Sequence, residues 1–354
     1  MYNNYYSEHY NNMKKLFKNK YFILIPILIL NIISLLYLYN TSYFNKQLLY
    51  IGLSYIILFI LSKINLKYIF KYIKYLYLFS IFLLLLVLLI GREVHGAKAW
   101  LHLYGFSIQP SEITKLILTI YLAYLTYKNK NIFILFLLTL IPSILTFLEP
   151  DTGAIIFFII IFISTLKYSN IKKKYLIASI LIIFLFITLN ISLYFINKDI
   201  LINIYGTKLF YRIDRLISFK EQNNIQTINS LISIGSHKLI YIPENHNDFI
   251  YAAIISKYNS IAFIITIISF SLIILYYINL INKKKNISNI YNFILLNMLL
   301  FQIFYNILMN LSLLPIIGIP LPFLSYGGSY LLTLYALIGL SINLSKHSSN
   351  KDKV

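Results

Sequence analysis

Apolar stretches long enough to cross a bilayer recur along the whole sequence, and they constrain the fold more than any other feature. About ten such stretches of roughly 17–25 residues can be placed, the length that a membrane-spanning helix needs. Hydrocarbon offers no partner to a backbone polar group, so these stretches have to be helical. The sequence therefore predicts an all-α integral membrane protein with about ten transmembrane helices, near residues 21–39, 48–65, 74–91, 111–127, 131–148, 153–168, 175–196, 250–280, 288–311 and 322–344.

Charged residues are sorted between alternate connectors. All acids except Glu8 and Asp352 avoid one set of connectors, and most lysines fill that set. A net charge of +20 could indicate a nucleic-acid partner, but this sorting is the positive-inside pattern of a membrane protein, so no nucleic acid is expected. Both termini are predicted in the cytoplasm, with tails at 1–19 and 346–354 on either side of one polytopic membrane domain, 20–345.

The remaining acids and the arginines lie on the predicted extracytoplasmic side, where any chemistry is therefore expected. The connector at 197–247, between the seventh and eighth spans, is the largest soluble piece there. Arg212 and Arg215 share one face of a predicted helix in it, which suits bidentate phosphate binding at a membrane surface; a solvated amphipathic helix is the alternative. The absence of cysteine excludes disulfides, thiolate metal sites and a cysteine nucleophile.

The segment 91–115 contains the only tryptophan and a helix start. Ser111 is predicted to cap that helix, because it follows a proline and precedes an acid. Glu112 and Lys115 are three residues apart, so they share a helix face and can form an ion pair. The pair has either a structural or a direct role, and Trp100 is either an interfacial anchor or a site residue.

Two further segments interrupt the apolar pattern. The segment 148–154 predicts a tight turn in which Asp151 caps the following helix. The segment 315–329 contains three prolines and three glycines, which break any helix. Irregular backbone at membrane depth is tolerated where it is buried in protein or lines a water-filled cavity, so this segment is predicted to line a cavity.

The segment 242–252 places two carboxylates, Glu244 and Asp248, at the predicted boundary between water and membrane. A carboxylate that enters hydrocarbon is costly, so one in this position is a candidate for function. His246 lies between them and is interpreted as a bystander.

In this order, these segments resemble the SEDS family of shape, elongation, division and sporulation proteins. The resemblance covers roughly residues 20–345, and the stretch GREV-x-GAK at 91–98 leans toward its rod-shape-determining branch. The matching motifs are GA-x-x-W at 96–100, QPSE-x-x-K at 109–115, PD-x-G at 150–153, PE-x-x-x-DF-I at 243–250 and GIPLPF-x-SYGGS at 318–329.

The resemblance implies a peptidoglycan glycosyltransferase that polymerises lipid II, a disaccharide-pentapeptide on undecaprenyl pyrophosphate, at the outer face of the cytoplasmic membrane. It also implies a partner, a class B penicillin-binding protein, and a role in cell elongation and shape. The essential acid of the family corresponds to Asp248, and its ion pair to Glu112 and Lys115.

This chemistry suits the residues. A partly buried carboxylate is a suitable general base for the acceptor hydroxyl, which predicts that role for Asp248. The pyrophosphate leaving group needs positive charge; Lys98, Arg212 and Arg215 are the candidates, with a divalent cation, Mg²⁺ or Mn²⁺, as the alternative to them. No cofactor is certain. The other residues expected at the substrate cavity are Glu244, Asp151, Ser325, Gly327 and Gly328.

The chain departs from the family pattern at three places. Ala99 stands where an arginine is usual, and Lys98 is its candidate replacement. The glycine-rich run before the PE motif is reduced within 226–243. Ser256 and Lys257 replace an acidic pair, which predicts a change in how Asp248 is held.

Three other functions remain open. A lipid II flippase would also use many helices, a cavity and buried charges. The scarcity of polar residues in the inner half of the spans disfavours it. The others are a division-type member of the family and a non-catalytic activator of a penicillin-binding protein.

Overall fold

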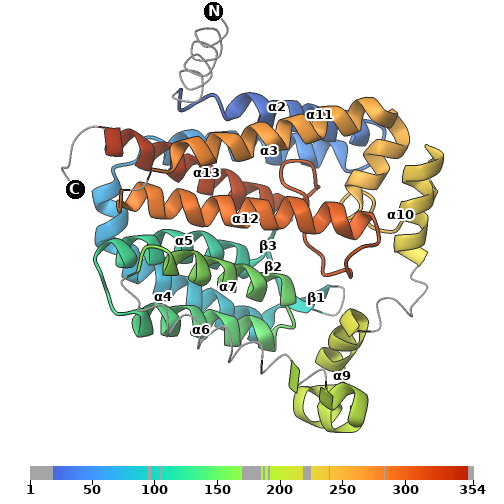
Figure 1. The fold of residues 1–354 in the computed structure, drawn as a ribbon, viewed down its shortest axis with the longest axis horizontal. Coiled ribbons are helices and arrows are strands. Elements are labelled where there is room, and N and C mark those ends of the chain that lie inside the picture. The colour runs from blue at the N-terminus through green and yellow to red at the C-terminus, as the bar shows by residue number, and fades with distance from the viewer. Residues whose placement is uncertain are drawn as a thin grey trace, which may run out of the picture.

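The structure is a computed structural model, and helices dominate it (Figure 1). Most of the predicted seventh span at 175–196 and most of both predicted tails lie outside the described residues. The described residues are 19–94, 97–103, 106–169, 185, 188–189, 192–217, 225–238, 240–282 and 284–349.

Every predicted span that falls within the described residues corresponds to a helix. Five of the described helices are long and apolar enough to cross a membrane, and α2, α6 and α7 are shorter apolar helices. The chain is therefore a multi-pass membrane protein, whereas the count of ten spans stays a prediction. The helices that correspond to the predicted spans are α2 (Leu24–Leu38), α3 (Phe44–Leu61), α4 (Leu66–Ile90), α5 (Pro110–Tyr127), α6 (Ile132–Leu148), α7 (Thr152–Leu166), α11 (Ile250–Leu280), α12 (Ile287–Asn310) and α13 (Gly328–Ser349).

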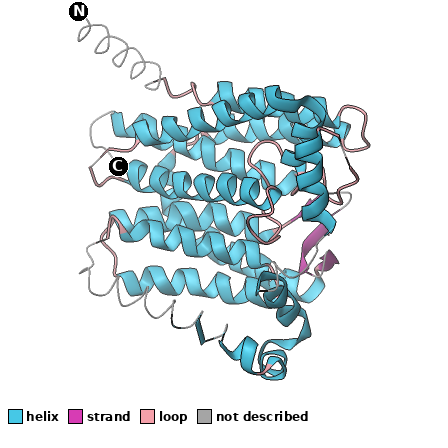
Figure 2. Ribbon diagram, turned by 45° about the vertical axis from the view of Figure 1, so that its right-hand side comes forward, coloured by secondary structure: helices cyan, strands magenta, loops and turns pink. Residues whose placement is uncertain are grey.

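A small antiparallel sheet that was not predicted lies between α4 and α5. Its strands are β1 (Arg92–Val94), β2 (Ala97–Leu103) and β3 (Phe106–Ile108), in that order across the sheet (Figure 2). The register pairs Leu101 with Ile108 and Leu103 with Phe106. The all-α prediction thus holds for the spans but not for this connector.

Of the two helix caps predicted from the sequence, the structure confirms one and contradicts the other. Asp151 caps α7 as predicted, because its Oδ1 accepts from the Ala154 amide at 3.1 Å. The prediction that Ser111 caps α5 is wrong: α5 begins at Pro110, and the cap position is Gln109. Proline is suited to the first helical position, where its missing amide hydrogen costs no hydrogen bond.

The long connector before α11 is itself partly helical. It contains α9 (Lys198–Ile217), which Gly206 interrupts with a φ of 76°, and α10 (Ile225–Ser236). The buried hydroxyl of Ser230 in α10 donates to the Asn310 carbonyl at 2.7 Å, so α10 is fixed to the end of α12. In both views α9 lies at the edge of the molecule (Figures 1 and 2).

α11 is two helices joined by a break. Asn259 has a φ of 55° and a ψ of −151°, which no helix contains. Residues 250–255 before the break are all buried, whereas the part after it includes exposed apolar side chains such as Ile261 and Ile268. The short first part is therefore a piece of the protein interior, and the apolar span begins after Asn259.

Contacts join connectors that the charge pattern assigns to the same side of the membrane. The Lys346 ammonium lies 5.3 Å from the Tyr21 ring, so the first and last described segments meet. The Lys285 ammonium donates to Asn129 at 2.6 Å, which joins two other lysine-rich connectors. The location of both chain ends in the cytoplasm stays a prediction.

Candidate active site

One cavity brings together segments from all the motifs singled out above. Its volume is about 430 Å³, within the range of ligand pockets in proteins. It is lined by Trp100 of β2, by residues of the 150–154 turn and of 316–320, and by the carboxylates of Glu112, Asp151, Glu244 and Asp248. Gly327 and Gly328 also line it, whereas Ser325 lies directly behind the wall. Four acids from distant parts of the sequence therefore share one space.

Asp248 lies on the short turn before α11. Burial and the neighbouring Glu244 carboxylate raise the pKa of Asp248 to about 7. Glu244 has a φ of 59°, and its carbonyl accepts from the amides of Asn247 and Phe249, which closes the turn. A carboxylate with this pKa is present in both protonation states near neutral pH, which suits proton transfer.

Two asparagines that the sequence analysis missed hold Asp248 in place. Asn306 and Asn310 lie one turn apart on α12, and both are fully buried. Their amide groups donate to the Asp248 carbonyl at 2.9 and 3.0 Å. Asn310 also accepts from the Ala252 amide at 3.1 Å, and Asn306 donates to the Ile319 carbonyl at 2.8 Å. The pair thus fixes the acid and the irregular segment to one helix. Its i, i+4 spacing in an apolar span is the signal that could have found it.

The irregular segment 315–329 is fastened to the acid-bearing turn. The Ser325 hydroxyl donates to the Asn247 carbonyl at 2.8 Å and accepts from the Leu321 amide at 2.7 Å. The Tyr326 amide donates to the His246 carbonyl at 2.9 Å. The predicted broken segment therefore lines the cavity and also supports the turn on which Asp248 lies.

Two glycines of this segment allow close approaches. Gly318 has a φ of 77°, a conformation that side chains disfavour, and a Cβ there would lie 3.6 Å from Asp248 Oδ2. A Cβ at Gly328 would lie 2.9 Å from two ring carbons of Tyr50. Both positions bring backbone to the cavity wall without a side chain.

Asp151 connects the start of α5 to the turn before α7. Its Oδ2 accepts from the side-chain amide of Gln109 at 2.8 Å and from the Ser111 hydroxyl at 2.9 Å. Glu149, two residues earlier, is fully buried, and burial raises its pKa to about 9. Glu149 is therefore neutral near pH 7 and adds no charge beside the cavity.

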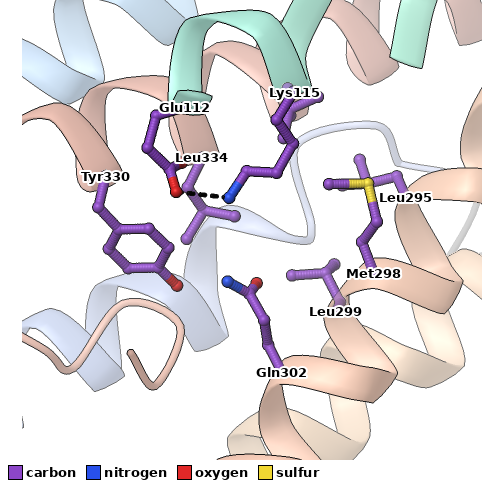
Figure 3. Close-up of a pocket in the computed structure, with 9 residues that line it drawn as sticks. Glu112, Lys115, Leu295, Met298, Leu299, Gln302, Tyr330 and Leu334 are labelled. Carbon is purple, nitrogen blue, oxygen red and sulfur yellow. Dashed lines mark hydrogen bonds and ion pairs between the residues drawn. The ribbon is translucent and has the colours of Figure 1, made fainter. Parts of the chain in front are cut away.

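The predicted ion pair is formed deep in the protein. Lys115 Nζ lies 2.6 Å from Glu112 Oε1 (Figure 3). It also lies 4.4 Å from the centre of the Phe157 ring. Glu112 Oε2 accepts from the Thr333 hydroxyl at 2.9 Å. Gln302 extends toward the pair, beside a second cavity of about 10 Å³, the size of one water molecule (Figure 3). Glu112 lines both cavities, so the pair links the active-site wall to the core.

Of the three cations that were predicted to bind phosphate, only Lys98 has a described side chain, and Lys98 does not line the cavity. Lys98 Nζ donates to the carbonyls of Leu88 and Leu89 at 2.8 and 3.0 Å, so it caps the C-terminus of α4. Arg212 and Arg215 lie on α9, and their side chains are outside the described residues.

The departures from the family pattern have local explanations. Ala99 is buried and lines the cavity, where its small side chain adds space. Lys257 donates to the Tyr37 carbonyl at 3.3 Å and lies 5.5 Å from that ring, so its charge is at the C-terminus of α2. The Ser256 hydroxyl donates to the Ala253 carbonyl in its own helix. Each of these two side chains thus makes a helix-end or intrahelical contact rather than a contact to Asp248.

Among the described residues, no three His, Asp or Glu side chains lie close enough together to hold a metal ion.

Comparison with known proteins identifies the family. The model FTSW_RODA_SPOVE, described as cell cycle protein, matches residues 14–350. The chain belongs to this family. It is the SEDS family that the motifs resemble, and the rod-shape-determining branch is supported only in part, because the relatives below have division and sporulation names.

Several curated relatives are named probable peptidoglycan glycosyltransferase FtsW. The protein from Wigglesworthia glossinidia brevipalpis is 31% identical, over 94% of this chain and 95% of its own. The protein from Buchnera aphidicola subsp. Baizongia pistaciae is 33% identical, over 84% and 83%. Stage V sporulation protein E of Bacillus subtilis is 26% identical over 88% of this chain and 90% of its own. The predicted enzyme class agrees with the FtsW names.

Two solved structures share the fold. A chain from a peptidoglycan synthase complex aligns with a TM-score of 0.78 and 21% identity, over 93% of this chain and 98% of its own. The rod shape determining protein RodA of Thermus thermophilus aligns with a TM-score of 0.67 and 21% identity, over 94% and 98%. The helical architecture is therefore that of RodA.

Proposed function

We propose that this chain is a peptidoglycan glycosyltransferase that polymerises lipid II into glycan strands. The observation that carries the proposal is the acid-lined cavity, in which Asp248 is held by backbone contacts and has a pKa of about 7. The names of the FtsW relatives support the same activity. The active site faces the extracytoplasmic side of the cytoplasmic membrane in this proposal, with a class B penicillin-binding protein as partner.

In the proposed reaction, Asp248 takes the proton of the acceptor sugar hydroxyl. The hydroxyl oxygen then forms a bond to the anomeric carbon of the donor sugar. The bond from that carbon to the pyrophosphate oxygen breaks, and the lipid pyrophosphate leaves with the electron pair. A base whose pKa lies near the working pH is effective in such a step.

The leaving pyrophosphate needs cations at the mouth of the cavity. Arg212 and Arg215 remain the candidates of this proposal, because guanidinium groups bind phosphate with two hydrogen bonds. Lys98 would have to exchange its contacts with α4 for contacts with phosphate. A Mg²⁺ or Mn²⁺ ion that enters with the pyrophosphate stays the alternative.

A flippase is the main rival, and buried polar groups bear on it. The sequence suggested that the inner half is almost free of them, but α12 and α13 carry several near the lysine-rich end. The Ser341 hydroxyl donates to Asn292 at 2.6 Å, and Asn292 donates to Ser288 at 3.2 Å and Ser345 at 3.3 Å. Polar groups that bond to each other fasten membrane helices together rather than line a path.

Purified protein with its penicillin-binding partner tests the proposal against the flippase and the non-catalytic activator. We expect glycan strands from lipid II, resolved on a gel, and no transfer of labelled lipid II between the leaflets of liposomes. Transfer without strands would replace the proposal by the flippase. Crosslinking stimulated in the absence of strand formation would replace it by the activator. A role in elongation is distinguished from a role in division by complementation. The gene is expressed in a strain depleted of its elongation-type family member and in a strain depleted of its division-type member, and the strain whose growth it restores identifies the role.

The rate of strand formation should depend on pH through Asp248. The ionised carboxylate is the active form, and its pKa is about 7. The initial rate is therefore expected to rise from about pH 6 to about pH 8 and to level off above it. Initial rates with saturating lipid II measure this, and a rate that falls over the same interval contradicts the assignment of Asp248 as a base.

Replacing Asn306 by leucine should lower both stability and turnover. The substitution removes the side-chain donor of the Ile319 carbonyl and leaves the Asp248 carbonyl with Asn310 alone, at an expected cost of about 1–3 kcal/mol of unfolding free energy. It also loosens the segment that bears Asp248, so kcat should fall while KM changes little. Asn297→Leu is the matched control: Asn297 lies on the same helix but donates to Ser164 at 2.8 Å. An equal loss of kcat in both variants would refute the positioning role.

A further inference from the structure

A cluster of aromatic rings forms one wall of the large cavity. Tyr50 of α3 and Tyr326 of the irregular segment both line the cavity, with ring centres 6.0 Å apart. Tyr43 packs behind Tyr326 at 5.0 Å, and His246 stacks on Tyr43 at 4.1 Å with nearly parallel rings. We call Tyr50 and Tyr326 the aromatic platform; Tyr43 and His246 hold it from behind.

Hydrogen bonds join the aromatic platform to the turn that carries Asp248, the proposed general base. The Tyr326 amide donates to the His246 carbonyl, two residues before Asp248. The neighbouring Ser325 hydroxyl donates to the Asn247 carbonyl. A ligand that rests on the platform therefore lies in the same cavity as the Asp248 carboxylate, and it can reach Asn247 and Glu244, which line the cavity as well.

The charge of the lining selects the ligand. Carboxylates and the amides of Gln109, Gln226 and Asn247 line the cavity, and no lysine or arginine does so among the described residues. Lys115 is close by, but it is paired with Glu112. Such a lining repels a diphosphate, whereas it suits hydroxyl groups, which donate to carboxylates and amide oxygens.

We propose that the aromatic platform is a saccharide site, on which a pyranose ring of the substrate stacks while the diphosphate stays outside the acid-lined part of the cavity. The face of a pyranose presents C–H groups with partial positive charge, and the face of an aromatic ring is negative. The hydroxyl groups at the ring edge then reach Asn247, Glu244 and Asp248. This inference rests on the proposed function for the identity of the sugar.

The protein carries its own reporter for this site. Trp100 is the only tryptophan of the chain, and it lines the cavity. Binding of a sugar can therefore be followed by Trp100 fluorescence in the purified full-length chain, with no turnover needed. The two probes are lipid II and undecaprenyl pyrophosphate, which has the same lipid and diphosphate but no sugar.

We expect lipid II to change the Trp100 emission with saturation, and undecaprenyl pyrophosphate to bind at least about tenfold more weakly. Tyr326→Leu should weaken lipid II binding about tenfold, and Tyr50→Leu should weaken it too. Tyr326→Phe keeps the ring and should stay within about twofold of the wild type. Tyr75→Leu, at a 66% exposed tyrosine of α4, is the matched control and should bind like the wild type.

Equal binding of the two probes to the wild type would overturn the inference, whatever the variants do. Retained affinity in both leucine variants would overturn it as well. Thermal unfolding of each variant separates loss of the site from loss of the fold. A wild-type chain that binds lipid II through the platform but forms no glycan strands would refute the proposed function and leave the saccharide site standing.

Discussion

Asp248→Asn should lower the rate of glycan polymerisation by about 10²–10⁴-fold, the range found when a general base is removed. Asparagine keeps the shape of the side chain, and the Asp248 carbonyl that Asn306 and Asn310 bind is unaffected. The acceptor hydroxyl, however, loses the group that takes its proton. Polymerisation of lipid II by the purified complex measures the loss.

The interpretation depends on binding being intact in that variant. Lipid II should still change the Trp100 emission, because the aromatic wall is untouched. Glu93→Gln is the matched control, since Glu93 is an exposed acid of β1 outside the cavity lining, and it should polymerise at the wild-type rate. A polymerisation rate within about threefold of the wild type in Asp248→Asn would assign the base to another residue.

The second large effect concerns stability. Lys115→Met should lower the unfolding free energy by about 3–5 kcal/mol, because it leaves the Glu112 carboxylate buried without its counter-charge. The side chains of Lys115 and Glu112 are only 5% and 13% exposed, so bulk solvent screens the unpaired carboxylate weakly. Denaturant or thermal unfolding in detergent measures the change, with Lys63→Met at an exposed position as the control.

The double variant Glu112→Gln with Lys115→Met makes the test specific. Removal of both charges relieves the unpaired carboxylate, so the double variant should be more stable than Lys115→Met alone. Additive losses would show that the two side chains act independently. Glu112 lines the active-site cavity, and strand formation is therefore expected to fall in both variants.

Apolar length and charge sorting predicted the described spans because both are strong, repeated signals. Charge sorting alone predicted that Glu112, Asp151, Glu244 and Asp248 lie on the same side of the membrane. The motifs indicated that they belong to one site, and in the structure they line one cavity. The break in α11 was not predicted, because Asn259 is neither proline nor glycine and the short polar stretch 256–260 lies inside a segment, 250–280, that is long enough to be a single span.

The small sheet and the asparagine pair escaped prediction for different reasons. The strands β1 and β3 have three residues each, too few for an alternating pattern. Asn306 and Asn310 lie in an apolar helix, where amides commonly fasten one helix to another. Only the fold reveals that these two amides face backbone groups of the acid-bearing turn rather than a neighbouring span.

The asparagine pair has a consequence for how this enzyme can change over time. Asn306 and Asn310 bind the carbonyls of Asp248 and Ile319, which every residue type supplies, and the amide of Ala252, which every residue type except proline supplies. Residues around the acid can therefore be exchanged without loss of the contacts that place it. A lineage with a strongly biased composition can keep the active-site geometry through these two amides while the sequence beside them drifts.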